Sequence, residues 1–219
     1  RIVGVEGPFA LSFSVANYRV VNEFMYDDDQ APDILQFVEL YNAGPSPMDI
    51  SGYKIELGDS VARYTVTIPA GTTIASGGFW TVGQSAVASL PGAVVDLIDN
   101  SLNLGDTGFA TANGKIYVAV RTAGNTLLDA AAAETNKATP VFPADVLLQI
   151  GPGIWGNTVM DDAALATDGR FFDGLDTDNN GRDFGILPAT PGYSNAMPDR
   201  MPYFEDLNSL ASGTNVPSW

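Results

Sequence analysis

The chain of 219 residues contains no cysteine and no histidine. Without cysteine there is no disulfide framework, no thiolate zinc site and no thiol nucleophile. Without histidine a Ser–His–Asp triad cannot form, and the usual histidine zinc sites are excluded. The sequence also lacks a G-x-x-x-x-G-K phosphate-binding motif and a dinucleotide fingerprint. These absences remove the main nucleophilic, zinc-dependent and nucleotide-dependent enzymes, and leave a two-carboxylate glycosidase as the open catalytic alternative.

Positive charge and long apolar runs are also scarce. The sequence has 10 Lys and Arg against 26 Asp and Glu, which gives a formal net charge of −16. A surface this acidic repels phosphate backbones, so we expect no nucleic-acid partner. The sequence has no apolar run of about 18 residues, the length that a membrane-spanning helix needs, so we expect no membrane span. Few lysines, abundant small polar residues and a first residue Arg1 in place of Met are typical of a processed, exported protein.

What the sequence does contain is a series of short apolar runs separated by turn residues. It has 23 Gly and 14 Pro, and many runs alternate between apolar and polar side chains, which indicates strands with one buried face. Turn signals roughly every 8 to 12 residues predict an all-β sandwich or barrel of about ten strands. The expected strands are 9–15, 18–26, 35–42, 52–57, 63–68, 79–82, 93–98, 115–121, 127–130, 146–150 and 184–187. A single helical turn is expected over 85–90.

The run 36–44, QFVELYNAG, is followed at once by 48–53, MDISGY. Together they resemble the signature of the lamin tail domain, an immunoglobulin-like β-sandwich. Further segments continue the resemblance in the family's order: 68–74, 77–79, 102–108, 173–180, 183–184, 190–192 and 195. The resemblance implies one such sandwich over residues 18–195, with an extra strand or arm over 1–17. Residues 196–219 are then a C-terminal arm or the start of a further module, because 203–208 resemble the opening of a lectin-like jelly roll.

Two segments fit the family less simply. Residues 128–134, LDAAAAE, favour a helix by alanine propensity, whereas the resemblance implies an edge strand in the first half. We therefore expect a strand to about Ala130 and a helical turn after it. Residues 131–154 are longer and richer in Ala and Pro than the family norm, which indicates an insertion or an interaction loop.

The sharpest local motif is the acidic segment 176–183, DTDNNGRD. Oxygen side chains at its first, third and fifth positions, with Gly at the sixth, match the first half of an EF-hand-type calcium loop. The twelfth position is a leucine where that motif needs a bidentate Glu. The alternative is an Asx-rich turn whose carboxylates accept backbone N–H groups. The candidate Ca²⁺ ligands are Asp176, Asp178, Asn180, Arg182 and Asp183.

Other acidic residues allow two interpretations each. Asp27–Asp29 with Asp33 predict a solvated loop, or a second cation site. Asp161–Asp162 are expected to start a short helix, where negative charge suits the N-terminal dipole. Glu39 lies mid-strand and is expected to pair with Arg19 or Arg63; a catalytic acid is the alternative.

Three scattered tryptophans complete the candidates: Trp80, Trp155 and Trp219 either pack in the protein or stack on sugar rings. In bacteria the lamin tail domain recurs as an accessory or structural module of secreted and surface proteins. We therefore expect a non-catalytic, secreted or cell-surface bacterial module that works by protein–protein contact and has no cofactor beyond Ca²⁺.

The most concrete version is a self-assembling subunit. In the apolar strand 9–15 the side chains of Phe9, Leu11, Phe13 and Val15 share one side, and they are the candidate interaction residues. Such a strand can be donated to the sheet edge of another copy. The alternative is an accessory or carbohydrate-binding domain of a larger secreted hydrolase or adhesin.

Overall fold

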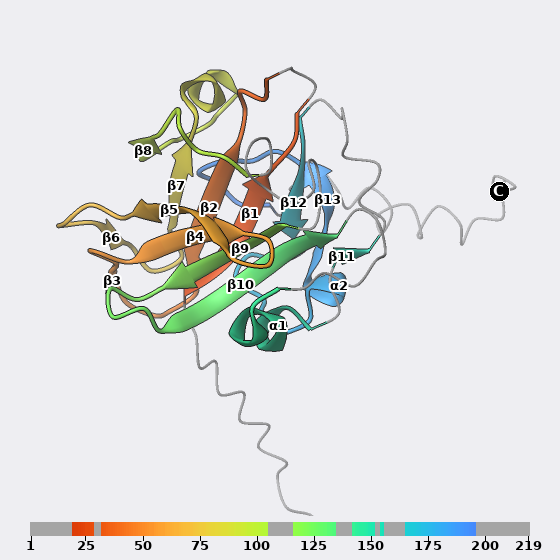
Figure 1. The fold of residues 1–219 in the computed structure, drawn as a ribbon. Helices are drawn as coiled ribbons and strands as arrows, with labels where there is room; N and C mark the ends of the chain where they lie inside the picture. The colour runs from red at the N-terminus through yellow and green to blue at the C-terminus, as the bar shows by residue number, and fades with distance from the viewer. Residues whose placement is uncertain are drawn as a thin grey trace, which may run out of the picture.

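Two β-sheets lie face to face, a five-stranded sheet in front of a six-stranded one in Figure 1. The computed structural model describes residues 19–28, 32–104, 116–134, 142–151, 154–155 and 165–195. The predicted all-β class and immunoglobulin-like sandwich are confirmed. The described residues form thirteen strands, somewhat more than the ten or so expected, because several are only two residues long.

The six-stranded sheet has the order β13-β12-β1-β2-β7-β8. Its neighbours are antiparallel except for β7 and β8, which run parallel. Its strands are β1 (Arg19–Met25), β2 (Phe37–Asn42), β7 (Phe79–Gly83), β8 (Leu97–Ile98), β12 (Ala166–Arg170) and β13 (Phe184–Pro188).

The five-stranded sheet has the order β11-β10-β9-β4-β5. A separate two-stranded sheet pairs β3 with β6, and a short 3₁₀ helix over Ser85–Ser89 confirms the helical turn expected there. The remaining elements are β3 (Met48–Asp49), β4 (Lys54–Gly58), β5 (Ala62–Thr67), β6 (Thr73–Ile74), β9 (Ile116–Arg121), β10 (Leu127–Glu134), α1 (Ala144–Ile150), β11 (Ile154–Trp155) and α2 (Asn180–Asp183).

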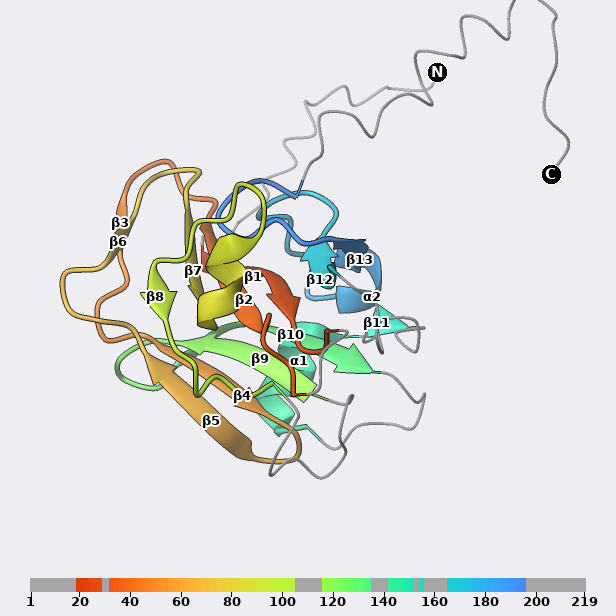
Figure 2. The ribbon, with the colours of Figure 1, turned by 90° about the horizontal axis from the view of Figure 1, so that it is seen from above.

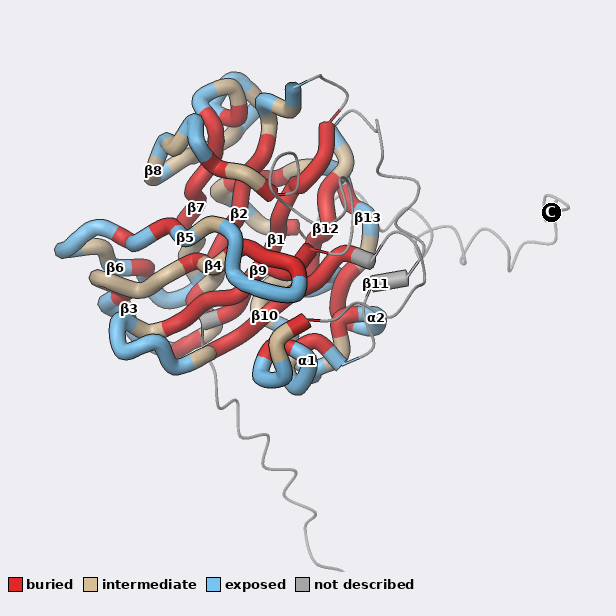
Figure 3. The backbone as a smooth tube through the Cα atoms, viewed as in Figure 1, coloured by how far each residue is buried: buried red, intermediate tan, exposed pale blue. Residues whose placement is uncertain are grey.

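The core lies between the two sheets, and Figure 3 shows that the residues of their central strands are largely buried. Alternate side chains of the facing strands enter it, as the period of two predicts. On β4, for example, Ile55 and Leu57 are buried in the core while Lys54 and Glu56 on the other face are partly exposed. Burial of this apolar surface, at roughly 25 cal/mol per Å², is the main stabilising contribution to the sandwich.

The alanine run of β10 is the first correction to the sequence prediction. It is strand throughout, so the helical turn expected after Ala130 is wrong. Ala131 and Ala133 face the inter-sheet core, whereas Ala130 and Ala132 face α1. Because β10 is covered on both faces, small side chains are needed there, and tertiary packing outweighs the helix propensity of alanine.

The segment 146–150 is the second correction, because it is helix α1 and not a strand. Val146 and Ile150, four residues apart, form its buried face and pack with Phe142 over β9 and β10. Leu148, which a strand would place on the same side as both, is 77% exposed. Much of the expected insertion 131–154 is therefore part of the packed body.

Two smaller differences concern the ends of the sandwich. β12 was not expected, and only Leu97–Ile98 of the expected strand 93–98 is paired. The expected strand 9–15 with Phe9, Leu11, Phe13 and Val15, the arm 196–219, and Asp161–Asp162 lie outside the described residues. Among the described helices none has the length and apolar character needed to cross a membrane.

Candidate functional site

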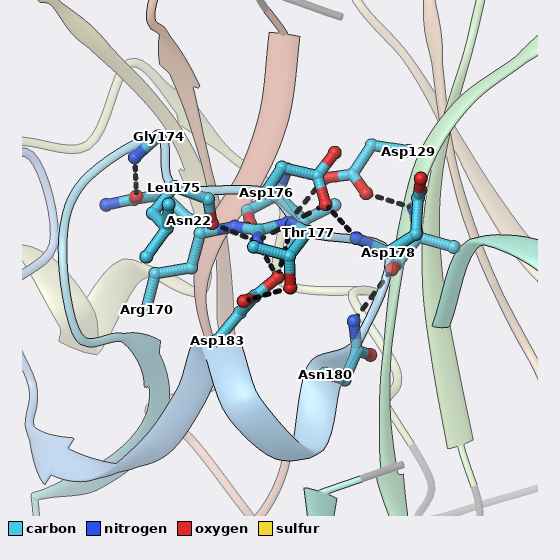
Figure 4. Close-up of polar contacts among 12 residues, drawn as sticks. Asn22, Asp129, Arg170, Gly174, Leu175, Asp176, Thr177, Asp178, Asn180 and Asp183 are labelled. Atoms are coloured by element: carbon cyan, nitrogen blue, oxygen red, sulfur yellow. Dashed lines mark hydrogen bonds and ion pairs between the residues drawn. The ribbon is translucent and has the colours of Figure 1, made fainter. Parts of the chain in front are cut away.

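The acidic segment 176–183 folds around the guanidinium of Arg170, the last residue of β12 (Figure 4). Arg170 is completely buried. Its Nη2 lies 2.9 Å from Asp129 Oδ2 on β10, and its Nη1 lies 3.3 Å from Asp183 Oδ2 and 3.6 Å from Asp176 Oδ1. One arginine thus compensates the charge of three carboxylates, one on β10 and two in segment 176–183.

The remaining donors of Arg170 bind backbone carbonyls. Its Nε donates to Val21 O at 2.8 Å, and its Nη1 also donates to Leu175 O. The guanidinium carbon lies 4.5 Å from the centre of the Phe184 ring, in the range of a cation–π contact. The fork geometry and multiple donors of arginine suit this arrangement, which ties β12 to β1 and to the segment that follows β12.

Of the predicted calcium ligands in this segment, Asp176, Asn180 and Asp183 have side-chain partners within the chain. Asp183 Oδ2 and Oδ1 accept hydrogen bonds from Thr177 N and Oγ1, each at 2.7 Å, in addition to the ion pair with Arg170. Asp176 Oδ1 accepts from Asp178 N at 3.1 Å, and Asp178 has a φ of 52°. These are the contacts of an Asx-rich turn.

Asn180 holds a different position in the molecule. Its Oδ1 accepts from Ala132 N at 2.8 Å, and its Nδ2 donates to Ala130 O at 3.4 Å. The side-chain amide therefore pairs with the outer backbone edge of β10 as a neighbouring strand would. Within the described residues no group of three or more acidic side chains is arranged to hold a metal ion. Calcium binding stays a prediction.

A second buried cluster contains two glutamates, Glu23 on β1 and Glu39 on β2, both with 0% exposure. Glu39 Oε1 accepts from Asn22 Nδ2 at 3.0 Å, and its Oε2 accepts from Gly192 N at 2.6 Å. Glu23 Oε1 accepts from Thr190 N at 2.9 Å. Both acids thus bind segment 190–192 to the sheet.

The hydrogen bonds around Thr190 indicate the protonation state of the Glu23 carboxyl group. Asn195 Nδ2 donates to two carbonyls, of Asn22 and Arg170, so its Oδ1 must face Thr190 Oγ1, 2.8 Å away. Thr190 Oγ1 also lies 2.9 Å from Glu23 Oε2. One hydroxyl hydrogen cannot serve both acceptors. A proton on Glu23 supplies the missing hydrogen, because Glu23 then donates to Thr190 and Thr190 donates to Asn195.

Burial raises the pKa of acids in both clusters. Burial raises the pKa of Glu23 to about 7, against the hydrogen bonds from Thr190 that lower it. Burial, and then the charge of Glu23, raises the pKa of Glu39 well above its ordinary value. Burial also raises the pKa of Asp129 to about 6, although the charge of Arg170 opposes this. Desolvation disfavours the charged form in each case.

Asp173 and Asn195 join the two clusters. Asp173 Oδ1 accepts from Asn22 Nδ2 and from Asn195 N, each at 3.0 Å, and its Oδ2 accepts from Ser194 Oγ. The combined network fixes segment 171–195 to β1, β2 and β10. A catalytic acid has to reach its substrate, whereas the oxygens of Glu39 are buried and accept hydrogen bonds from the fold.

Several contacts in the structure differ from those expected from the sequence. Arg63 is not the partner of Glu39, since it pairs with Asp59 at 2.9 Å, and the side chain of Arg19 is not described. The solvated-loop interpretation is wrong for Asp27 and Asp28, which are buried. Asp28 Oδ2 instead accepts from the backbone N–H groups of residues 34 and 35, at 2.8 and 2.6 Å.

Trp80 is 5% exposed and packs in the core, so it offers no open face to a sugar ring. Trp219 and the side chain of Trp155 lie outside the described residues. Arg170 and Glu23 were not singled out from the sequence. The available signal was a charged residue inside an otherwise apolar strand, as in VVNEFMY over 20–26.

The family model of the Lamin Tail Domain matches residues 16–138. The chain belongs to the lamin tail domain family. The matched part includes β1, β2 and β10, and it ends before β12, so Arg170 and segment 171–195 lie beyond it.

A solved structure has a similar fold over most of the chain. The crystal structure of a DUF4876 family protein from Bacteroides thetaiotaomicron VPI-5482 is similar with a TM-score of 0.51 and 13% sequence identity. The similarity covers 93% of this chain and 75% of that one. At this identity it shows the fold alone. A search of curated proteins finds no match.

Proposed function

We propose that this lamin tail domain is a non-catalytic module of the bacterial cell surface or exterior that works by protein–protein contact and assembles with copies of itself. The observation that carries the proposal is the engagement of its buried acids. Glu39 and Asp183 bind backbone and arginine groups of the fold, so these two buried acids serve structure. The family's non-enzymatic, immunoglobulin-like character supports the same conclusion.

Self-assembly is attributed to the apolar alternating segment at the N-terminus. Phe9, Leu11, Phe13 and Val15 form an apolar row that a single edge of a neighbouring sheet can accept. Residues 1–18 contain one pair of opposite charges, Arg1 and Glu6, so their side chains add no net charge to a chain of −16. An uncharged donor segment reduces the repulsion between two acidic bodies.

The first prediction concerns removal of this segment. Static light scattering should show multimers for the full chain and single chains for a variant lacking residues 1–17. The matched control is a full-length chain in which Ala10 and Ser12 are exchanged, which keeps the apolar row and should still assemble. Equal masses for the full and shortened chains would reject strand donation, while an unchanged circular dichroism spectrum would show that the sandwich itself is intact.

The second prediction concerns Ca²⁺ at segment 176–183. Asp183 and Asn180 are engaged in the fold, so a bound ion would use Asp176 and Asp178. Burial, and then the negative charges of Asp176 and Asp183, raise the pKa of Asp178. Added Ca²⁺ should then raise the melting temperature, by mass action on the folded state, and a chelator should reverse the rise. Asp178→Asn should weaken the response. A melting temperature indifferent to Ca²⁺ would leave the segment as a plain Asx turn.

A further inference from the structure

Most long edges of the two sheets are closed to further strands. On β10 the side chain of Asn180 occupies the outer backbone groups of Ala130 and Ala132, and β11 pairs with the end of the strand. β8, the last strand of the six-stranded sheet, is only two residues long. These edges offer little continuous backbone for pairing.

The edge strand β13 is also a poor acceptor. Ala189 N and Asp183 O bond to the chain of β12, so by alternation the backbone groups of Phe184, Ile186 and Pro188 point outward. The N–H of Phe184 already binds Asn180 O in α2, and proline has no N–H. One outward N–H, that of Ile186, is left on the strand.

β5 is different, and Figure 2 shows it at the outer margin of the molecule. Its six residues, ARYTVT, contain neither Gly nor Pro. The N–H of Ile68, two residues after Val66, donates to the carbonyl of Tyr53, the residue before β4, at 2.8 Å. By alternation the N–H and C=O groups of Thr65 and Thr67 point away from the sheet. Such an edge is a template for another strand.

The two faces of β5 differ in character. Tyr64 and Val66 face inward and pack with the core, whereas Thr65 and Thr67 are exposed on the outer face. The one charged side chain, Arg63, is held by Asp59 at 2.9 Å. An added strand would therefore need an apolar inner row and a small polar outer row.

We propose that β5 accepts residues 9–15 of a second copy as an added strand, an inference that rests on the proposed self-assembly. In this segment, FALSFSV, Phe9, Leu11, Phe13 and Val15 extend the apolar inner row. Ala10, Ser12 and Ser14 fall beside the threonines, where Ser–Thr cross-strand pairs are favourable.

The donor is a second copy because the chain's own β5 is out of reach. Val15 lies four residues before Arg19, and four extended residues span at most about 14 Å. The start of β1 lies over β10, since Val21 N donates to Asp129 Oδ2 at 2.8 Å. In the order β10-β9-β4-β5 the strand β5 is three positions further on. Three strand spacings are about 14 Å across the sheet, and the two sheets are about 10 Å apart. The distance from the start of β1 to β5 is therefore roughly 17 Å.

The experiment is complementation between two full-length variants. Thr65→Pro removes an outward N–H from the acceptor without breaking a bond to β4, and Phe13→Lys puts a charge into the apolar row of the donor. In sedimentation each variant alone should be a single chain, and their mixture should form a two-chain complex, because each supplies what the other lacks. Ser12→Lys, with the same charge on the polar row, should assemble like the unmodified chain.

The outcomes separate the two proposals. If the unmodified chain assembles and Thr65→Pro assembles equally well, β5 is not the acceptor while self-assembly stands. If the unmodified chain is a single chain at every concentration, both proposals fail. Should Thr65→Pro not fold, Thr65→Cys and Ser12→Cys replace it, since the chain has no cysteine of its own. Oxidation of that mixture should give a disulfide-linked heterodimer, and its absence would overturn the inference.

Discussion

Glu23→Gln should make the protein more stable at pH 8, by about 3 kcal/mol, and leave it unchanged at pH 4.5. Glutamine reproduces protonated Glu23, because its oxygen can accept from Thr190 N and its Nε2 can donate to Thr190 Oγ1. The unmodified chain loses this arrangement when Glu23 ionises beside Glu39 and Asp173. The variant has no charge to bury at any pH.

The sign follows from the raised pKa of Glu23. Folded Glu23 keeps its proton up to about pH 7, whereas the unfolded group loses it near its ordinary value of 4.5. Between these values the folded state binds more protons, so the free energy of unfolding falls as pH rises through the window. The contribution is fully present below pH 4.5 and lost above about 7. Urea unfolding at pH 4.5, 6 and 8 measures it.

Glu39→Gln is the matched control for Glu23→Gln, with the same chemical change and the opposite expected result. Both oxygens of Glu39 accept N–H groups, from Asn22 and Gly192, and an amide nitrogen has no lone pair to accept either. A donor left facing a donor costs about 1–3 kcal/mol. A stabilising Glu39→Gln, or a destabilising Glu23→Gln at pH 8, would contradict the assignment of the proton.

Arg170→Met should destabilise the sandwich by about 3–5 kcal/mol at pH 8, the cost of leaving buried carboxylates without their partner. Asp129 and Asp183 would lose their ion pairs, and Val21 O and Leu175 O would lose their donor. Arg170→Lys keeps the positive charge but loses the forked guanidinium, so its stability should lie between those of the unmodified chain and Arg170→Met. Guanidinium unfolding followed by circular dichroism gives the free energies.

Arg63→Met is the control for Arg170→Met, since it breaks the single ion pair to Asp59, and the Arg63 side chain is 34% exposed. It should cost less than about 1 kcal/mol. The loss in Arg170→Met should also shrink as the pH falls from 8 to below 6, because Asp129, whose pKa Arg170 lowers, then protonates and its charge disappears. Equal losses for the two variants, or a loss in Arg170→Met that does not change with pH, would show that Arg170 does not hold the network.

The fold was predictable from the sequence because alternation and the 36–53 signature both depend on local order. The errors at β10 and α1 have different causes, and at β10 the cause is that a strand covered on both faces is not visible in a one-dimensional pattern. The run after Ala130 favours a helix by propensity until α1 is seen to pack on Ala132. Val146 and Ile150 fit a period of two as well as of four, and the exposure of Leu148 decides between them.

The site was less predictable, because its partners are far apart in the chain. Segment 176–183 was predicted as a calcium loop or an Asx-rich turn, but the sequence did not indicate that Arg170 pairs with Asp183 and, on β10, with Asp129. Glu39 was expected to be buried and paired, yet its partners are the amides of Asn22 and Gly192. Spacing along the sequence carries no information about such pairings across sheets.

Hydrogen exchange of the β5 amides tests the contact function most directly. In single chains the amide of Val66, bonded to β4, should be protected and those of Thr65 and Thr67 should exchange fast. In the assembled full-length chain all three should be protected, because an added strand binds the outward groups. Fast exchange at Thr65 and Thr67 in assembled protein would contradict the account.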